Sequence, residues 1–247
     1  MDPAPFPSPT LTWHTNTYQS ISPTRPELSA KGKTVVVTGG GTGIGAETAR
    51  YFAEAGASRI ALLGRREQPL LDTKASIEQN FTGVEVFVAS TDVTKKSEVE
   101  AAFAKFAGDG KINVLVSNAA MIGPQDPVNE VDGDKFLGAI QQNLKGSLWV
   151  AQAFLRYAST DAVAIDINSS AAHLNFAPKF ASYSIAKLAI FRLWDSLAFA
   201  NSEISVFHLQ PGIVDTALNK EGGGVDAFGF EDDGKWNGDL LSGLSRD

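Results

Sequence analysis

A glycine-rich loop lies directly between a β-branched run and the start of a helical pattern. Residues 34–37 continue into the segment Thr-Gly-Gly-Gly-Thr-Gly-Ile-Gly, which spans residues 38–45. Glycine lets a backbone turn sharply and approach a ligand, and the N-terminus of a following helix offers free N–H groups and partial positive charge. This loop between a strand and a helix predicts a phosphate-binding turn for a nucleotide, whereas a merely flexible loop is the alternative.

Short apolar runs alternate with helical periods along most of the chain. The runs expected as strands are 34–38, 59–63, 84–89, 112–117, 162–167 and 204–209. Most of them are apolar on both faces, as strands covered on both sides should be. The stretches between them place apolar residues at helical spacing, around Phe52, Phe103, Leu144 and Trp194. The pattern predicts an α/β fold of a single domain, a Rossmann-type doubly wound parallel sheet in a three-layer α/β/α arrangement.

The two ends of the chain differ from this regular part. Residues 1–30 hold six of the 11 prolines and many Ser and Thr residues, which indicates either an extended arm that lays Trp13 and Tyr18 on the body or plain disorder. Residues 31–216 form the expected nucleotide-binding catalytic domain. Residues 217–247 are expected to be a short loop-rich tail, with at most a short strand near 236–241.

The overall composition excludes several classes of protein. The 247 residues include no Cys and carry a formal net charge of −7. This balance gives no electrostatic reason to bind nucleic acid or an anionic membrane, and the three His residues show no metal-ligand spacing. No apolar run reaches the roughly 18–20 residues of a membrane span. We therefore expect a cytoplasmic protein with a small-molecule partner and no metal.

The end of the second expected strand bears on cofactor choice. A site for NAD usually carries Asp or Glu here to accept from the ribose 2′-hydroxyl, but this chain has Gly64, Arg65 and Arg66. A guanidinium can pair with a 2′-phosphate, so the sequence favours NADP(H) over NAD(H), unless these are ordinary surface arginines. Asp92 is placed to accept from an adenine amino group or to cap the next helix.

A tyrosine and a lysine stand four residues apart on an expected helix. Tyr183 and Lys187 therefore share one helix face, where the lysine ammonium favours the phenolate form of the tyrosine. Ser170 ends the fifth expected strand, on the side of the sheet where ligands bind. It could hold a substrate carbonyl while Tyr183 gives or takes the proton, although Ser169 is an alternative.

Together these motifs resemble the short-chain dehydrogenase/reductase family, in its single-domain form. The resemblance covers roughly residues 31–216. It rests on the glycine loop, on Tyr183 with Lys187, and on three further matches, which are Asn118-Ala119-Ala120, Asn143 and Pro211-Gly212-Ile213-Val214-Asp215-Thr216. Ser117 and Ala120 replace the commoner residues around Asn118, and the tail after Thr216 is short for a substrate lid.

The resemblance implies a role for each matched residue. Tyr183 would be the catalytic acid or base, Lys187 would assist it and bind the nicotinamide ribose, Ser170 would polarise the carbonyl, and Asn143 would hold a water linked to Lys187. The residues expected to contact the cofactor are Gly39, Thr42, Gly43, Ile44, Gly45, Arg65, Arg66, Asp92, Val93, Asn118, Ala119, Tyr183, Lys187, Val214 and Thr216. The helices that carry Asn143 and Tyr183 would form a homo-oligomer.

The expected activity is an NADPH-dependent carbonyl reductase, or the reverse alcohol dehydrogenase, by analogy in fungal secondary metabolism. The alternative is an NADP(H)-binding regulator or a catalytically silent relative with an incomplete substrate pocket. One residue stays unexplained by the sequence: Asp166 lies inside an expected strand and needs a polar partner that the sequence does not identify.

Overall fold

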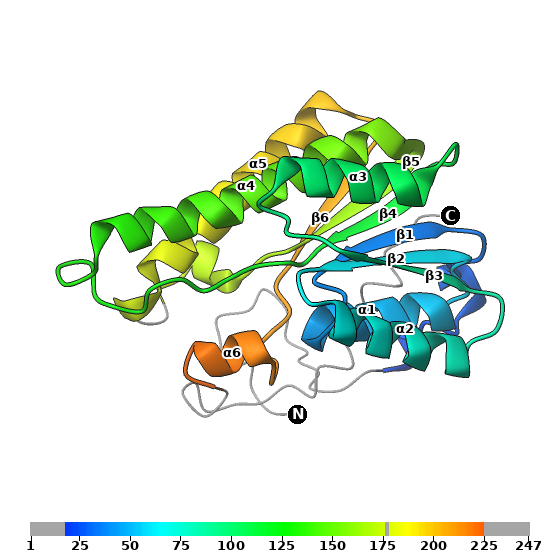
Figure 1. Ribbon diagram of the computed structural model, residues 1–247, viewed down its shortest axis with the longest axis horizontal. Helices are drawn as coiled ribbons and strands as arrows, with labels where there is room; N and C mark the ends of the chain where they lie inside the picture. The colour runs from blue at the N-terminus through cyan, green and yellow to red at the C-terminus, as the bar shows by residue number, and fades with distance from the viewer. Residues whose placement is uncertain (1–17, 176–177, 225–247) are drawn as a thin grey trace.

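The computed structural model describes residues 18–175 and 178–224 and shows one parallel six-stranded sheet (Figure 1). The strands are β1 (Thr34–Thr38), β2 (Arg59–Gly64), β3 (Glu85–Ser90), β4 (Ile112–Ser117), β5 (Ala158–Ile167) and β6 (Ser205–Leu209). Their order is β3-β2-β1-β4-β5-β6, and every neighbouring pair is parallel. The order reverses between β1 and β4, which makes the ends of these strands the expected ligand crevice.

Helices cover both faces of the sheet. They are α1 (Gly43–Glu54), α2 (Glu67–Asn80), α3 (Lys96–Ala107), α4 (Gly133–Tyr157), α5 (Ala181–Ala200) and α6 (Ala217–Glu221), with 3-10 turns η1 (Gln19–Ile21), η2 (Pro26–Leu28), η3 (Ser170–Ala172) and η4 (Pro178–Phe180). One core lies between the sheet and α1 and α2, and the other lies between the sheet and α3, α4 and α5 (Figure 1). The predicted Rossmann-type fold is confirmed, and β5 begins four residues earlier than expected.

Helices α4 and α5 pack against each other on one face of the sheet. Trp194 of α5 is fully buried, and its indole N–H donates to the Ser147 hydroxyl of α4 at 2.9 Å. Small residues, among them Ala139 and Gly146, take much of the buried face of α4. The apolar stripe that contains Leu144 is only half-buried.

The two chain ends are described in part. Of the expected arm, residues 18–30 contain η1 and η2, and the buried Ala30 donates its N–H to the Ala55 carbonyl at 2.8 Å. Trp13 lies outside the described residues, as does the strand expected near 236–241. In the described part of the tail, α6 follows Thr216. None of the helices in residues 18–175 and 178–224 has the length and hydropathy needed to cross a membrane.

Candidate active site

The glycine loop after β1 has backbone angles and close contacts that side chains would not permit. Gly39 and Gly43 have φ angles of +70° and +54°, which L-residues rarely adopt. A Cβ on Gly45 would lie 2.3 Å from the Gly39 carbonyl oxygen, and one on Gly43 would lie 2.9 Å from Cγ2 of Thr216. The sequence motif is thus required both by backbone conformation and by close packing of the loop on itself.

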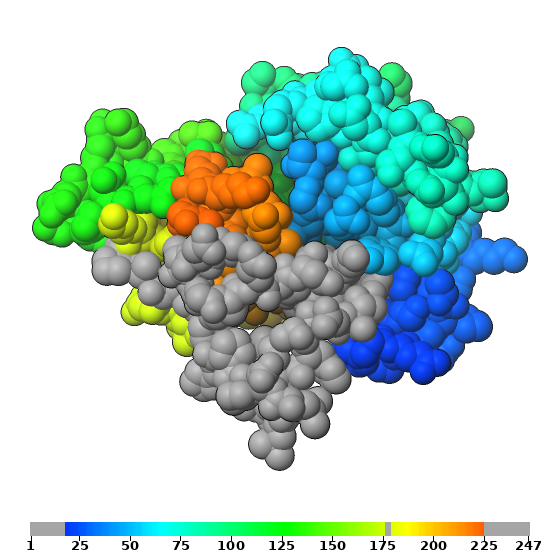
Figure 2. Space-filling view, turned by 90° about the horizontal axis from the view of Figure 1, so that it is seen from below, coloured from blue at the N-terminus to red at the C-terminus, as the bar shows by residue number. Residues whose placement is uncertain are grey.

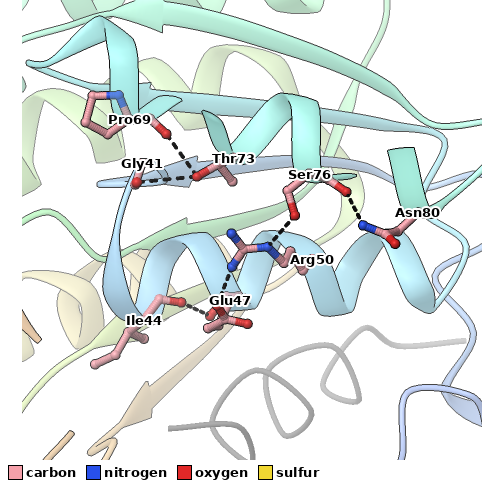
Figure 3. A network of polar contacts seen from close by, with 9 residues as sticks. Gly41, Ile44, Glu47, Arg50, Pro69, Thr73, Ser76 and Asn80 are labelled. Atoms are coloured by element: carbon pink, nitrogen blue, oxygen red, sulfur yellow. Dashed lines mark hydrogen bonds and ion pairs between the residues drawn. The ribbon is translucent and has the colours of Figure 1, made fainter. Parts of the chain in front are cut away.

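Helix α2 holds this loop from outside the site (Figure 3). The Thr73 hydroxyl lies 3.3 Å from the Gly41 carbonyl oxygen and 3.0 Å from that of Pro69. Further along, Arg50 of α1 pairs with Glu47 and donates from Nε to the Ser76 hydroxyl of α2 at 3.1 Å. These contacts fix α1 against α2 and so fix where the N-terminus of α1 points.

A cavity of about 350 Å³ opens at the N-terminus of α1. Thr42, the residue before the helix, makes no side-chain cap, so its hydroxyl does not occupy the first-turn N–H groups. Figure 2 shows a hollow between the orange atoms of the α6 region and the blue and cyan atoms of α1 and α2. The predicted cofactor residues that line this cavity are Gly39, Thr42, Gly43, Ile44, Arg65, Arg66, Asp92, Val93, Asn118, Ala119 and Thr216, and the predicted catalytic residue Asn143 lines it as well.

Four predicted cofactor residues lie elsewhere. Gly45 packs against Gly39 and does not line the cavity, so it shapes the loop. Val214 and Tyr183 line a second cavity, and Lys187 lines neither. A glycine cradle, free helix N–H groups and a lined cleft together fit a dinucleotide.

The end of β4 is tied to the end of β1 through Thr38. The Thr38 hydroxyl accepts from the backbone N–H groups of Asn118 and Ala119, at 2.9 and 3.0 Å. The Asn118 amide donates to the Thr38 carbonyl at 2.9 Å. Thr38 is buried and was not among the predicted site residues, although it is the first residue of the glycine motif. It sets the geometry of the crevice where the strand order reverses.

Cationic and acidic groups follow β2 and β3. Burial raises the pKa of Asp92, but hydrogen bonds from the Thr94 N–H and hydroxyl, and the charges of Lys95 and Arg65, outweigh burial and hold that pKa below its ordinary value. Asp92 is therefore an ionised acceptor. Lys95 stands at the N-cap position of α3 without a side-chain cap hydrogen bond, and the Asp92 carboxylate accepts from Thr94 before the helix, so Asp92 is not the N-cap residue of the alternative interpretation.

The second cavity, of about 150 Å³, lies beside the first and shares Ile44, Thr216 and Leu218 with it. Ser170 and Tyr183 both line it. Ser169 lines it as well, but its hydroxyl accepts from the Ala171 N–H at 3.1 Å as the cap of η3. Among the described residues, the hydroxyls of Ser170 and Tyr183 have no hydrogen-bond partner, so they are the groups available to a bound ligand.

Lys187 is buried beside Tyr183. Its Nζ lies 5.7 Å from the centre of the Tyr183 ring and donates to the Ile167 carbonyl at 2.5 Å. The amide of Asn168 donates to the Lys187 carbonyl at 3.2 Å. The end of β5 thus holds this lysine at its backbone and at its ammonium group.

Asn143 uses its side chain to hold the loop after β4. Its Oδ1 accepts from the Met121 N–H at 3.0 Å, and its Nδ2 donates to the carbonyls of Met121 and Ala139 at 2.9 and 3.1 Å. The amide therefore positions the Met121 segment at the cavity wall. The water expected at Asn143 stays a prediction.

Asp166 has the partner that the sequence did not identify. It is 2% exposed, and its Oδ2 lies 3.0 Å from Nδ1 of His208 on β6 and 2.5 Å from Nδ2 of Asn168. Since Asn168 also binds Lys187, the pair lies next to the groups that surround Tyr183.

Comparison with known proteins identifies the family. The sequence profile described as short chain dehydrogenase matches residues 33–223. The chain belongs to the short-chain dehydrogenase family. This is an oxidoreductase family that uses a nicotinamide cofactor, which agrees with the cradle at the N-terminus of α1.

Individual relatives of this short-chain dehydrogenase cover most of its length. The short chain dehydrogenase/reductase AacuD of Aspergillus aculeatus is 30% identical over 229 residues, 92% of this chain and 79% of that protein. A glucose 1-dehydrogenase of Gluconobacter oxydans is 32% identical over 193 residues, 76% of this chain and 71% of that protein. The solved alcohol dehydrogenase of Thermococcus sibiricus, complexed with 5-hydroxy-NADP, has a TM-score of 0.75 and 27% identity, covering 87% of this chain and 90% of that one.

Proposed function

We propose that this short-chain dehydrogenase is an NADPH-dependent oxidoreductase that acts on the carbonyl or secondary alcohol of a small organic substrate. One observation carries the proposal: the hydroxyls of Ser170 and Tyr183, which have no hydrogen-bond partner within residues 18–175 and 178–224, line a cavity that adjoins the glycine-loop cavity through Ile44 and Thr216. A bound nicotinamide supplies the hydride donor or acceptor. The chain itself has to bind the substrate and move the proton.

The side chains divide that work. The Ser170 hydroxyl donates to the substrate oxygen and orients it. The Tyr183 hydroxyl gives its proton to that oxygen during reduction and takes it back during oxidation. Nζ of Lys187 lies 5.7 Å from the tyrosine ring centre, on the same helix face as the group that exchanges the proton. Asn168 and Ile167 hold the lysine, and Asn143 holds the wall of the cofactor cavity.

The preference for NADP(H) is part of the proposal. Arg65 and Arg66 line the larger cavity after β2, at the position where an acidic residue would favour NAD. A guanidinium there offers a bidentate contact to a 2′-phosphate. The 5-hydroxy-NADP complex of the archaeal alcohol dehydrogenase supports the same cofactor class.

The biological setting is a separate part of the proposal. The similarity to a relative from the fungus Aspergillus aculeatus agrees with a fungal setting, and secondary metabolism and a cytoplasmic location stay predictions. Neither is needed for the chemistry at Ser170 and Tyr183.

We also propose that α4 and α5 form a homo-oligomer interface. Apolar side chains on these helices are exposed, and Leu188 of α5 is 48% accessible. Leu188→Glu should shift the protein toward monomer in light scattering. The matched control is Leu71→Glu, a similarly exposed leucine on α2 that lies across the sheet from α5. Equal masses for both variants would refute this interface.

A paired assay tests the function. NADPH binding is measured by calorimetry, and NADPH oxidation is followed with a panel of ketones, quinones and aldehydes. The proposal predicts both binding and turnover. Binding without turnover across the whole panel would favour a silent relative or regulator instead.

A further inference from the structure

The second cavity is mostly apolar. Side chains from the loop after β4, from η4 and from the segment after β6 line it, and they include Ile122, Phe180, Ile213 and Leu218. Such walls favour an apolar substrate body and give it no fixed orientation by themselves. Orientation requires polar groups that are free to bind.

Most polar groups at this cavity are already engaged. The Asn168 amide binds Asp166, the Lys187 carbonyl and the Ser169 N–H. The Thr216 hydroxyl caps α6 by accepting from the Asn219 N–H at 3.1 Å. Ser170 and Tyr183 are assigned to the reacting oxygen by the proposed function.

The side chain of Gln210 at the rim is exposed to solvent, and one buried amide in the described part of the chain is left over. Nδ2 of Asn219 is buried and has no hydrogen-bond partner among the residues that the structure describes, and Asn219 lines the same cavity as Ser170 and Tyr183. A buried N–H group without a partner is unfavourable, and most such groups in folded proteins are satisfied. An oxygen of a bound molecule would satisfy it.

Helix α6 holds this amide in place. Thr216 caps its first turn, and the Gln125 side chain donates to the Glu221 carbonyl at 2.6 Å. Gly222, which follows the helix, packs so closely that an added Cβ would lie 2.8 Å from the Ile122 side chain. The helix is therefore capped at its start and held against the cavity wall at its end, which points to a preorganised donor.

We propose that Asn219 donates a hydrogen bond to a second oxygen of the substrate. The inference rests on the proposed function and narrows it: the substrate is an otherwise apolar hydroxyketone or diketone, or the matching alcohol. Its reacting oxygen lies at Ser170 and Tyr183, and its second oxygen lies at Asn219. A simple ketone binds without satisfying the amide.

Matched substrates test this assignment. We compare 4-hydroxycyclohexanone and 1,4-cyclohexanedione with 4-methylcyclohexanone, which has a similar shape and no second oxygen. In the wild type, kcat/KM should be about tenfold higher for the two substrates with a second oxygen than for 4-methylcyclohexanone, because one buried hydrogen bond contributes about that factor. Asn219→Leu should remove this preference and leave 4-methylcyclohexanone within about twofold. Asn219→Asp, which lacks the N–H groups, should behave like Asn219→Leu on the oxygenated pair.

The contrary results are equally specific. An equal loss for all three ketones would assign Asn219 to the packing of α6, and no change would refute the contact. A second arm measures binding of 4-hydroxycyclohexanone to the NADPH-loaded proteins by saturation-transfer NMR. If the wild type turns over no ketone, the proposed function fails, but the binding measurement still tests the role of Asn219. Equal binding of 4-hydroxycyclohexanone by the wild type and by Asn219→Leu would refute that role.

Discussion

Asp166 and His208 lie opposite each other on β5 and β6, with the carboxylate Oδ2 and the imidazole Nδ1 3.0 Å apart. A carboxylate buried to this degree is tolerated only because a hydrogen-bonding partner faces it. The Asn168 amide adds a second donor at 2.5 Å. The pair thus fixes the end of β5, shortly before Ser169 and Ser170.

Removing His208 should destabilise the fold. We expect His208→Leu to lower the free energy of unfolding by about 2–3 kcal/mol, less than the roughly 3–5 kcal/mol of a fully buried pair. The reduction has two reasons: His208 is 20% exposed, and Asn168 still donates to Asp166. Denaturant titration measures the change. The double variant Asp166→Val with His208→Leu should lose less than the single variant, and a larger loss would contradict the explanation that an unpaired buried carboxylate causes the loss.

This pair also shows where sequence reasoning ends. The six strands can be predicted because each is a short apolar run, rich in β-branched residues, that is visible in the local sequence. The partner of Asp166 depends on the register between β5 and β6, which are joined only through α5. No local pattern encodes that register, and His208 looked unremarkable in the sequence.

The same limit applies to the site. The glycine loop and the Tyr183 and Lys187 pair were predictable, because motif spacing fixes them on one loop and one helix face. The distinction between Ser169 and Ser170 was not predictable, because it depends on which hydroxyl caps η3. The free amide of Asn219 could not be predicted either, because α6 lacks a clear apolar period and is placed by contacts with Gln125 and Ile122.

Adding one methyl group to the glycine loop should damage it. In Gly45→Ala the new Cβ would lie 2.3 Å from the Gly39 carbonyl oxygen, so the loop must move. We expect NADPH affinity to fall at least about tenfold, because the first-turn N–H groups no longer meet the pyrophosphate in register. Calorimetry measures the affinity.

The control is a glycine on the helix α4. Gly138 has no atom within 4 Å of an added Cβ, so Gly138→Ala should keep NADPH affinity and stabilise the helix by up to about 1 kcal/mol. Similar losses in both variants would show that the close packing at Gly45 is unimportant.

Arg65 should distinguish the two nicotinamide cofactors. A charge-assisted hydrogen bond is worth about 1.5–3 kcal/mol, so Arg65→Ala should weaken NADPH binding roughly 10- to 100-fold and change NADH binding little. Dissociation constants for both cofactors measure the effect.

Asp92 provides the matched comparison at the same cavity. Its lowered pKa keeps it ionised, and we propose that it accepts from the adenine amino group, which both cofactors carry. Asp92→Ala should therefore weaken NADPH and NADH by similar factors. If Arg65→Ala also weakens both equally, Arg65 does not read the 2′-phosphate.

The central claim is that the Tyr183 hydroxyl transfers the proton, and Tyr183→Phe removes that hydroxyl alone. The account predicts that ketone-dependent NADPH oxidation falls by about 100-fold or more while the dissociation constant for NADPH stays within about twofold. Tyr157→Phe, at the end of α4 and outside both cavities, should retain wild-type turnover. Unchanged turnover in Tyr183→Phe, with NADPH still bound, would contradict the mechanism.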